Sequence, residues 1–405
     1  MFLTAGREDF KFLPGEYTCC VAPKKGLRVT LLEKQTVASE ATGLSCGTLY
    51  TAGPPKSTLS PAASSLPTFR YISSLLYQHL QALEDIEYTK CGCIQLATTP
   101  EELKFAKKSY EGEVDMVRKP EAVKFCKSLE EVRDILPEAG PSVLGGVYTP
   151  NSGQVNAGLA AHKCAEIAEE RGAIVRENVT VKKITKSNGV YTVESSRGEI
   201  FRAKAIVVAA GAWANDVIGK NKVDVYKVKG QMATSGMEAK QGEFSKMPVV
   251  YWFESYHAWS TKHTFPHHMT HDENFGRVTR HAYGKRSPSG NLFFGGDRFF
   301  PDHDADYEVN NKALDELFKK KIYPSLPSLS KFFSHDEAGS WAGIMPFSKD
   351  GYATIDCLDG EGLFVATGFG ASGIMDAPGA MFFLADWLRG NEKHPYLKKF
   401  EKRPS

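Results

Sequence analysis

A short glycine-rich segment near the end of the chain has residue types and spacing suited to ligand binding. "GFGASG" (368–373) has the spacing G-x-G-x-x-G, follows a strand-like run and opens a helix-like run. Backbone N–H groups at the start of a helix point at an anion or an electron-rich ring edge, and glycines allow a close approach. The segment therefore predicts a contact with such a group, and the alternative is close packing of a helix on a strand.

The position of this segment argues against a complete nucleotide-binding unit. Only about 30 residues follow it, which is too few for a finished βαβ unit. Glu392 has roughly the right spacing for a ribose-binding acid, but it lies in the loop-like stretch "RGNEKHP". The segment therefore predicts a helix N-terminus near a ligand, without a second strand.

A second candidate lies near the start of the chain, in "GLRVTLLEK" (26–34). The run is typical of the second strand of a dinucleotide-binding fold, and it ends in an acid, Glu33. A carboxylate at this strand end can accept hydrogen bonds from the hydroxyls of an adenosine ribose. The alternative for Glu33 is a solvated surface acid.

The bulk composition excludes several classes of protein. The chain has 405 residues and a net charge of +2, so nothing favours binding to nucleic acid or an anionic membrane. Apolar runs such as "AMFFLADWL" are too short to span a bilayer, and "MFLTAGREDF" has acids where a secretory signal would be apolar. The eight cysteines form no CxxC pair, which favours reduced thiols. Cytoplasm is therefore the default expectation, and the alternative is an organellar protein whose targeting segment is lost with an atypical N-terminus.

The spacing of the histidines gives little support for a metal site. Eleven are present, and "HHMTH" (267–271) could in principle ligate a metal. No HExxH motif or suitably spaced carboxylate accompanies it. We therefore predict no metal.

The alternation of elements predicts a mixed α/β fold. Strand-like runs at 27–33, 93–99 and 201–211 are joined by helical patterns at 68–84 and within 145–184. Residues 39–68 are rich in Ser, Thr, Gly, Pro and Ala, which indicates a long loop. The apolar run in "FRAKAIVVAAG" is typical of a buried parallel strand.

Several blocks together resemble the D-amino-acid-oxidase-like family of FAD-dependent oxidoreductases, to which the glycine, sarcosine and γ-glutamylputrescine oxidases belong. They follow the family's order over about residues 27 to 390. The blocks are "RVTLLEK", "ASEATGLSCGTL", "YTPNSGQVNAGLAAHKCAEIAEERGA", "VVAAGAWAN", "VKGQM", "NLFFGGD", "WAGIMPFSKDGYATID" and "LFVATGFGASGIMDAPG".

The resemblance implies a Rossmann-like FAD-binding domain and an interleaved α+β substrate domain built on an antiparallel sheet. The FAD-binding domain would comprise 1–84, 145–225 and 336–405, with 1–23 atypical, and the substrate domain 85–144 and 226–335.

The implied activity is oxidation of the C–N bond of an amine or amino acid, with hydride transfer to flavin N5. The substrate is a small molecule. No dedicated acid–base pair is implied, so we predict no catalytic side chain.

The resemblance also places cofactor contacts. The loop 41–49 would wrap the pyrophosphate, Val181 would contact the adenine, and "GFGASGI" would cup the pyrimidine end of the flavin. The predicted FAD-binding residues are Glu33, Lys34, Ala41, Thr42, Gly47, Leu49, Val181, Ala210, Gly211, Trp213, Gly343, Gly368, Gly370, Ser372, Gly373 and Ile374.

The chain departs from the family pattern at its start. In the family pattern, the three glycines of the phosphate-binding fingerprint precede the acid at the end of the second strand by about 23, 21 and 18 residues. Counting back from Glu33, the residues at these positions are Phe10, Phe12 and Gly15. "FKFLPG" is not a phosphate loop, and phenylalanines block close approach of the backbone. We therefore expect the glycine-rich strand–loop–helix to be missing and the sheet to lack its middle strand. An alternative first exon, an error in the gene model and a real loss each account for this.

Two further departures concern the substrate and the attachment of the flavin. In the glycine-oxidase branch an arginine grips the substrate carboxylate, and the matching residue here is Met345. Arg277, Arg280 and Arg298 are candidates to replace it, although each could be a structural charge. Gly343 and its neighbours offer no cysteine, so we expect noncovalent FAD. The alternative function is an inactive relative that does not hold FAD and acts, if at all, as a binding protein.

Overall fold

The computed structural model describes most of the chain. The described residues are 2–4, 28–56, 59–236, 239, 242, 244–254, 277–333, 339–348 and 350–402, with the backbone alone at 2–4 and 277. The segments "FKFLPG" and "HHMTH" and the side chain of Arg277 lie outside this description. Within it, no group of three His, Cys, Asp or Glu residues could hold a metal ion, and the cysteines are free.

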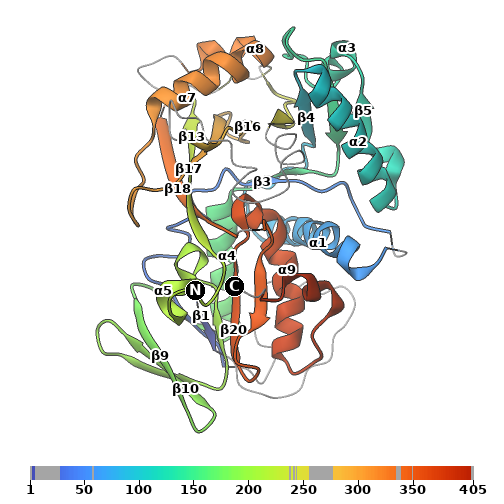
Figure 1. Ribbon diagram of the computed structural model, residues 1–405. Coiled ribbons are helices and arrows are strands. Elements are labelled where there is room, and N and C mark those ends of the chain that lie inside the picture. The colour runs from blue at the N-terminus through green and yellow to red at the C-terminus, as the bar shows by residue number, and fades with distance from the viewer. Residues whose placement is uncertain are drawn as a thin grey trace.

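A six-stranded sheet forms the lower half of the molecule in Figure 1. Its strand order is β19-β20-β12-β1-β2-β8. The bounds are β1 (Phe2–Thr4), β2 (Thr30–Leu32), β8 (Ile174–Arg176), β12 (Ile206–Val208), β19 (Thr354–Cys357) and β20 (Leu363–Thr367). β2 pairs with β8 in parallel, and β12 pairs with β20 in parallel.

The strand in the middle of this sheet, β1, runs in the direction opposite to both of its neighbours. β1 runs antiparallel to both β12 and β2, with Phe2 opposite Val208 and Leu32. The expectation of a sheet without its middle strand is therefore wrong. The backbone hydrogen bonds of β2 and β12 need a partner in this position, and a strand of either direction provides one. Because β1 is reversed, the chain leaves it at Thr4, beside the start of β12.

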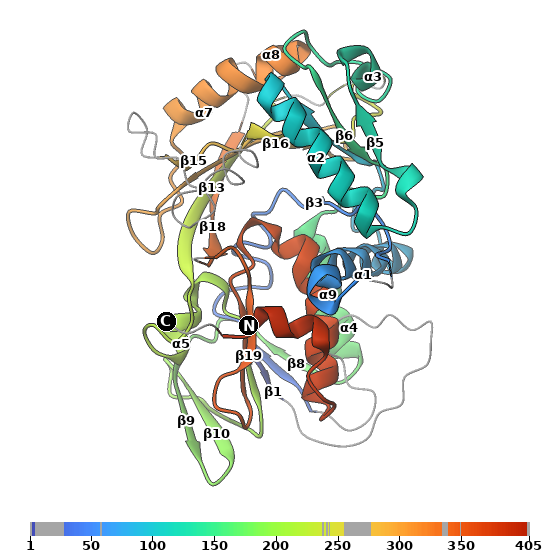
Figure 2. The ribbon, with the colours of Figure 1, turned by 45° about the vertical axis from the view of Figure 1, so that its right-hand side comes forward.

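Three helices pack on this sheet: α1 (Pro61–Leu83), α4 (Ala157–Glu170) and α9 (Gly373–Leu388). Figure 2 shows α1 and α9 side by side. Helix α1 begins earlier than the predicted residue 68 because Ser60 caps it, with its side chain accepting from the Ala63 N–H, and because Pro61 suits the first turn. A Cβ at Gly379 would lie 2.1 Å from the Phe69 carbonyl oxygen, so glycine permits this contact between α1 and α9.

A second sheet of nine strands forms the upper half (Figure 1). Its order is β18-β13-β17-β16-β14-β4-β6-β5, and β15 also pairs with β17. The bounds are β4 (Cys93–Ala97), β5 (Lys124–Cys126), β6 (Gly145–Thr149), β13 (Tyr226–Thr234), β14 (Val249–Trp252), β15 (Arg277–Thr279), β16 (Tyr283–Arg286), β17 (Leu292–Phe299) and β18 (Gly339–Phe347).

Helices cover the far side of the upper sheet: α2 (Pro100–Met116), α3 (Leu129–Arg133), α7 (Asn311–Leu317) and α8 (Tyr323–Ser325). Trp252 and Phe294, both fully buried, anchor the core between this sheet and α7–α8. The indole N–H of Trp252 donates to Ser325 Oγ at 2.9 Å, so the buried ring leaves no polar group unsatisfied.

Two smaller sheets and a short helix complete the fold. β3 (Thr48–Leu49) pairs with β7 (Gly153–Gln154), and β9 (Val181–Ser187), β10 (Val190–Ser195) and β11 (Ile200–Ala203) form a three-stranded sheet at the foot of the molecule (Figure 1). The predicted single strand in "FRAKAIVVAAG" is two strands, β11 and β12, in different sheets. A short helix, α5 (Ala214–Ile218), follows β12.

The predicted fold class is confirmed: a Rossmann-like domain is joined to a domain with a mainly antiparallel sheet. The domain boundaries stay a prediction, and two strands bear on them. β6 and β18 lie within ranges predicted for the FAD-binding domain, but both pair in the upper sheet. Among the described residues, no helix is long and apolar enough to cross a membrane.

A buried polar cluster connects the two halves. The Tyr50 hydroxyl donates to Glu113 of α2, and Arg70 of α1 forms an ion pair of 2.8 Å with Asp376 of α9. The guanidinium of Arg70 lies 5.9 Å from the Tyr50 ring centroid. Burial raises the pKa of Glu113 to about 7, although the bond from Tyr50 and the charge of Arg70 oppose the shift.

The first prediction concerns the pH dependence of stability. Between pH 4.5 and 7 the unfolded chain ionises Glu113 while the folded chain keeps the proton, so this residue makes stability fall as pH rises. Over that window we expect the wild type to lose up to about 3 kcal/mol relative to Glu113→Gln. Chemical unfolding at several pH values measures this, with exposed Glu111→Gln as the control on the same helix. A wild type and an E113Q variant with parallel pH profiles would contradict it.

Candidate functional site

A single cavity of about 690 Å³ is lined by both halves of the described structure. Its size is within the range of small-molecule sites, roughly 300–1,000 Å³. The lining comes from the loop after β2, the turn after β12, the loop and helix after β20, and strands β13, β17 and β18 of the upper sheet. The cavity therefore lies at the carboxyl ends of the parallel strands, where open α/β sheets bind ligands.

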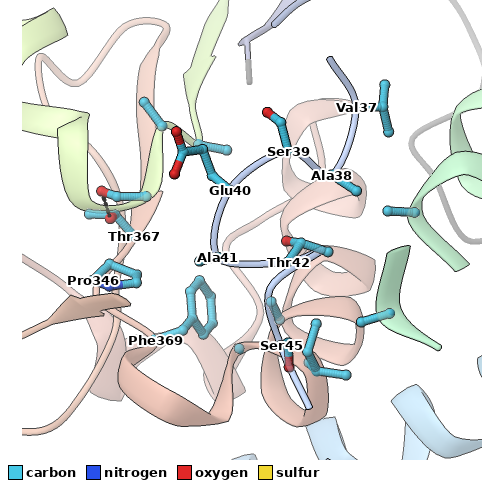
Figure 3. Close-up of a pocket in the computed structure, with 18 of the residues that line it drawn as sticks. Val37, Ala38, Ser39, Glu40, Ala41, Thr42, Ser45, Pro346, Thr367 and Phe369 are labelled. Atoms are coloured by element: carbon cyan, nitrogen blue, oxygen red, sulfur yellow. Dashed lines mark hydrogen bonds between the residues drawn. The ribbon is translucent and has the colours of Figure 1, made fainter. Parts of the chain in front are cut away.

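The loop after β2 forms one wall (Figure 3). Long-range hydrogen bonds hold it in place: the Val37 N–H donates to Glu177 Oε1 at 2.7 Å, and the Tyr307 hydroxyl donates to Glu40 Oε2 at 2.6 Å. Burial and the Glu40 charge raise the pKa of Tyr307, so this hydroxyl keeps its proton. The wall is thus fixed before any ligand enters.

Ser39, in this loop, carries a buried hydroxyl for which the described structure provides no hydrogen-bond partner. The residue lines the cavity (Figure 3). Buried polar groups are nearly always hydrogen-bonded in folded proteins. The oxygen itself has almost no accessible surface, so a rotation of the Ser39 side chain would be needed to bring the hydroxyl to a polar group of a ligand.

The turn after β12 forms the opposite wall. Gly211 has a φ of +53° and faces open space, since a Cβ there would meet no atom within 4 Å. Its carbonyl oxygen accepts from the Thr367 hydroxyl at 2.7 Å, which ties the ends of β12 and β20 together. This turn presents bare backbone to the cavity.

The predicted glycine segment supplies the N-terminus of α9. Gly370, Gly373 and Ile374 line the cavity, and Gly370 has a φ of +56°. The Tyr77 hydroxyl donates to the Ile374 carbonyl at 2.9 Å. An ion pair with Arg70 neutralises Asp376 in the first turn, so the partial positive charge of the helix end stays available to the cavity.

The upper sheet forms the roof. Trp341, Gly343 and Met345 alternate along β18 and all line the cavity. The indole N–H of Trp341 donates to the Leu44 carbonyl at 2.9 Å, which joins the roof to the loop after β2. Tyr283 and Arg298 contribute the polar part of the roof.

Most of the predicted cofactor residues come together at this cavity. Those in its lining are Glu33, Lys34, Ala41, Thr42, Val181, Ala210, Gly211, Trp213, Gly343, Gly370, Gly373 and Ile374. Their individual roles stay predictions.

Four predicted cofactor residues lie outside the lining. Gly47, directly before β3, packs on the Val155 carbonyl, and Leu49 of β3 is buried in a core cluster with Leu76. Gly368 has a φ of +79° in the turn before α9, and the Ser372 hydroxyl donates to the Phe369 carbonyl.

Of the predicted substrate residues whose side chains are described, some line the cavity and one does not. Arg298 and Met345 line the cavity. Arg280 does not, because its guanidinium pairs with Glu316 at 2.9 Å and Glu254 at 3.8 Å.

The structure also brings in residues that the sequence did not reveal. Ser39, Tyr283 and Trp341 line the cavity without having been predicted. Trp341 could have been found from strand periodicity, since it lies two residues before Gly343 on the same face. Ser39 offered no such signal, because it lies in an irregular loop.

Comparisons with known proteins agree on one family. Residues 19–387 match the family model described as "FAD dependent oxidoreductase". The glycine oxidase of Geobacillus kaustophilus is 26% identical over 381 residues, covering 91% of this chain and 88% of that protein. Its crystal structure superposes with a TM-score of 0.74 at 24% identity, covering 94% and 92% of the two chains.

Two further relatives extend the likeness. The 4-methylaminobutanoate oxidase (formaldehyde-forming) of Paenarthrobacter nicotinovorans is 23% identical over 325 residues, covering 77% of this chain and 35% of that protein. The iminodiacetate oxidase of Chelativorans sp. BNC1 shares the fold, with a TM-score of 0.71 at 19% identity over 92% of each chain.

The cavity fits FAD on three observations. The Ser39 hydroxyl has no hydrogen-bond partner among the described residues and could reach a phosphate oxygen after rotation of its side chain. The bare backbone at Gly211 leaves room for a ring, and the α9 N-terminus suits the electron-rich edge of a flavin. Among the described residues, the loop after β2 and the start of α9 are the backbone segments at this edge that line the cavity.

The second prediction tests Ser39. A hydrogen bond to a charged group contributes about 1.5–3 kcal/mol, so Ser39→Ala should weaken FAD binding by about 10-fold or more. Titration of the apoprotein with FAD, followed by flavin fluorescence, measures the dissociation constant. The control is Ser330→Ala, whose hydroxyl donates to Pro327 outside the cavity. An unchanged constant in S39A would refute a phosphate contact.

Proposed function

We propose, since this chain belongs to the family of FAD dependent oxidoreductases, that it oxidises the C–N bond of an amine or amino acid with noncovalent FAD as acceptor. One observation carries the proposal. A single cavity joins the predicted cofactor residues of the lower half to polar and apolar side chains of the upper sheet. The relatives named as oxidases of glycine and of 4-methylaminobutanoate support this substrate class.

Each part of the lining has a role in the proposal. Glu33 would accept hydrogen bonds from the adenosine ribose, and Val181 would contact the adenine. The N–H groups at the start of α9 would stabilise negative charge at the pyrimidine edge. When bound, FAD supplies the acceptor for a hydride from the carbon next to the amine nitrogen, at flavin N5.

The protein's own contribution is orientation and the exclusion of water. Trp341 closes the roof onto the loop after β2 through its bond to Leu44, and Met345 adds apolar surface. We assign no acid–base residue to the transfer. No cysteine lies in β18, where Gly343 faces the cavity, so nothing there attaches the flavin covalently.

The relatives give no support to the inactive alternative, since both are named as oxidases. The remaining argument for it is the reversed β1, which removes one source of phosphate-binding amides. This argument concerns the affinity for FAD and leaves the rest of the cavity unchanged.

The third prediction tests the function. The chain is purified with excess FAD and desalted, and its visible spectrum is recorded. We expect flavin bands, and bleaching of these bands under anaerobic conditions by at least one member of a panel of amines, amino acids and N-methyl amino acids. A flavin-loaded protein that no member of the panel reduces would overturn the proposed activity.

The fourth prediction concerns the start of the chain. Replacing residues 1–24 with a glycine-rich strand–loop–helix should tighten FAD binding at least about 10-fold, because amides that bond to a charged group contribute about 1.5–3 kcal/mol each. The matched control carries valines in place of the three loop glycines. Equal affinity in the graft and its control would show that the loop amides do not reach the cofactor.

A further inference from the structure

We propose that Tyr307 holds the strained loop after β2 in place and thereby sets how slowly FAD leaves the cavity, an inference that rests on the proposed binding of FAD. The tyrosine lies in residues 300–310, between β17 and α7, a segment that we call the strap. Tyr307 is not part of the cavity lining, whereas its partner Glu40 is. Tyr307 is therefore a positioning residue that acts on the cofactor through Glu40.

The loop after β2 shows two signs of strain at neighbouring residues. Ala38 has a φ of +63°, a conformation that glycine adopts freely and that costs free energy for a residue with a Cβ. The next residue, Ser39, has a buried hydroxyl without a hydrogen-bond partner in the described structure. Both residues line the cavity (Figure 3). Strain of this kind persists only where surrounding contacts impose it, and it is common at ligand clamps and switch segments.

Contacts within the loop make it a compact unit. The Leu44 N–H donates to the Glu40 carbonyl at 3.0 Å. A Cβ at Gly43 would lie 1.9 Å from the Ala38 carbonyl oxygen, so the loop folds back onto its own strained residue. A contact that holds Glu40 therefore also holds Ala38 and Ser39.

Two hydrogen bonds from distant parts of the chain hold this unit. The Val37 N–H donates to Glu177 Oε1 at 2.7 Å, and Glu177 directly follows β8 in the lower sheet. The Tyr307 hydroxyl donates to Glu40 Oε2 at 2.6 Å, and it comes from the strap beside the upper sheet. Because its acceptor is a carboxylate, the bond from Tyr307 is of the stronger, charge-assisted kind. It joins the cofactor loop to the substrate half of the molecule.

The strap that carries Tyr307 is firmly attached to β13. Lys229 forms an ion pair with Asp306 at 2.7 Å, and the two side chains are only 9% and 4% exposed. The Asp306 carboxylate also accepts hydrogen bonds from the N–H groups of Asp302 and Glu308, at 3.0 and 3.1 Å. The strap therefore presents the tyrosine hydroxyl from a fixed position, and removal of the hydroxyl leaves this attachment intact.

The first test measures the release of FAD. Flavin-loaded wild type and Tyr307→Phe are diluted, and the rise in flavin fluorescence gives the dissociation rate. Loss of a hydrogen bond to a charged group should speed dissociation about 10-fold. The control is Tyr323→Phe in α8, whose ring packs on Phe318 away from the cavity, and it should match the wild type. Equal rates for Y307F and the wild type would overturn the proposal.

The second test uses the strain at Ala38. Glycine adopts a positive φ without this cost, so Ala38→Gly should slow dissociation about 5-fold and recover part of the loss in Y307F. Ala41→Gly is the matched control, because Ala41 lies in the same loop without a positive φ, and it should not slow dissociation. A role of Tyr307 in general stability would not be rescued at residue 38. If A38G slows release in neither background, the proposal is wrong.

A measurement without flavin separates this inference from the proposed function. Amide hydrogen exchange of the apoprotein is followed over residues 36–44, where the N–H groups of Val37 and Leu44 are hydrogen-bonded. Faster exchange in Y307F within this segment alone supports the role of Tyr307, even if the chain oxidises no amine. Unchanged exchange there, or faster exchange throughout the chain, would contradict it, whichever substrates are turned over.

Discussion

The site depends on the close approach of the upper sheet to the loop after β2. That approach is fixed by the hydrogen bond from the Trp341 indole to the Leu44 carbonyl and by the contact of Gly343 with Leu44, where a Cβ would lie 3.0 Å from the leucine side chain. The ladder of β13 and β18, paired from Tyr226–Phe347 to Thr234–Gly339, holds both residues in register. Without this contact the cavity would open to water between the two halves.

The elements that the sequence predicted well are those with strong local signals. The strand β4 lies within the predicted run 93–99, and the helix α4 lies within the predicted helical pattern of 145–184. Prediction was poorer where tertiary contacts decide. Residues 61–67 look like a loop by composition, but they are helical because Ser60 caps the helix and α9 packs against it. The break between β11 and β12 depends on their pairing with different sheets, which no local pattern encodes.

The same distinction applies to the site. Family resemblance located residues that line the cavity, such as Gly211 and Gly370, because those positions are constrained by φ and by space. It was poorer for Leu49 and Gly47, since a short ribbon turns them away from the cavity. It could not choose between Arg280 and Arg298, because the choice depends on Glu316, which comes from a helix far along the chain.

The reversed β1 separates two functions that a forward strand would combine. A strand in the middle position completes the hydrogen bonds of β2 and β12 whichever way it runs, so the sheet is satisfied. Phosphate binding requires direction as well, because the turn after the strand must lie at the carboxyl edge of its parallel neighbours. Here Phe2 lies at that edge, and the chain leaves β1 at the other edge, at Thr4. In the described residues, completion of the sheet is therefore separate from phosphate binding at this position, and the loop after β2 and the start of α9 are the segments that we propose contact the cofactor.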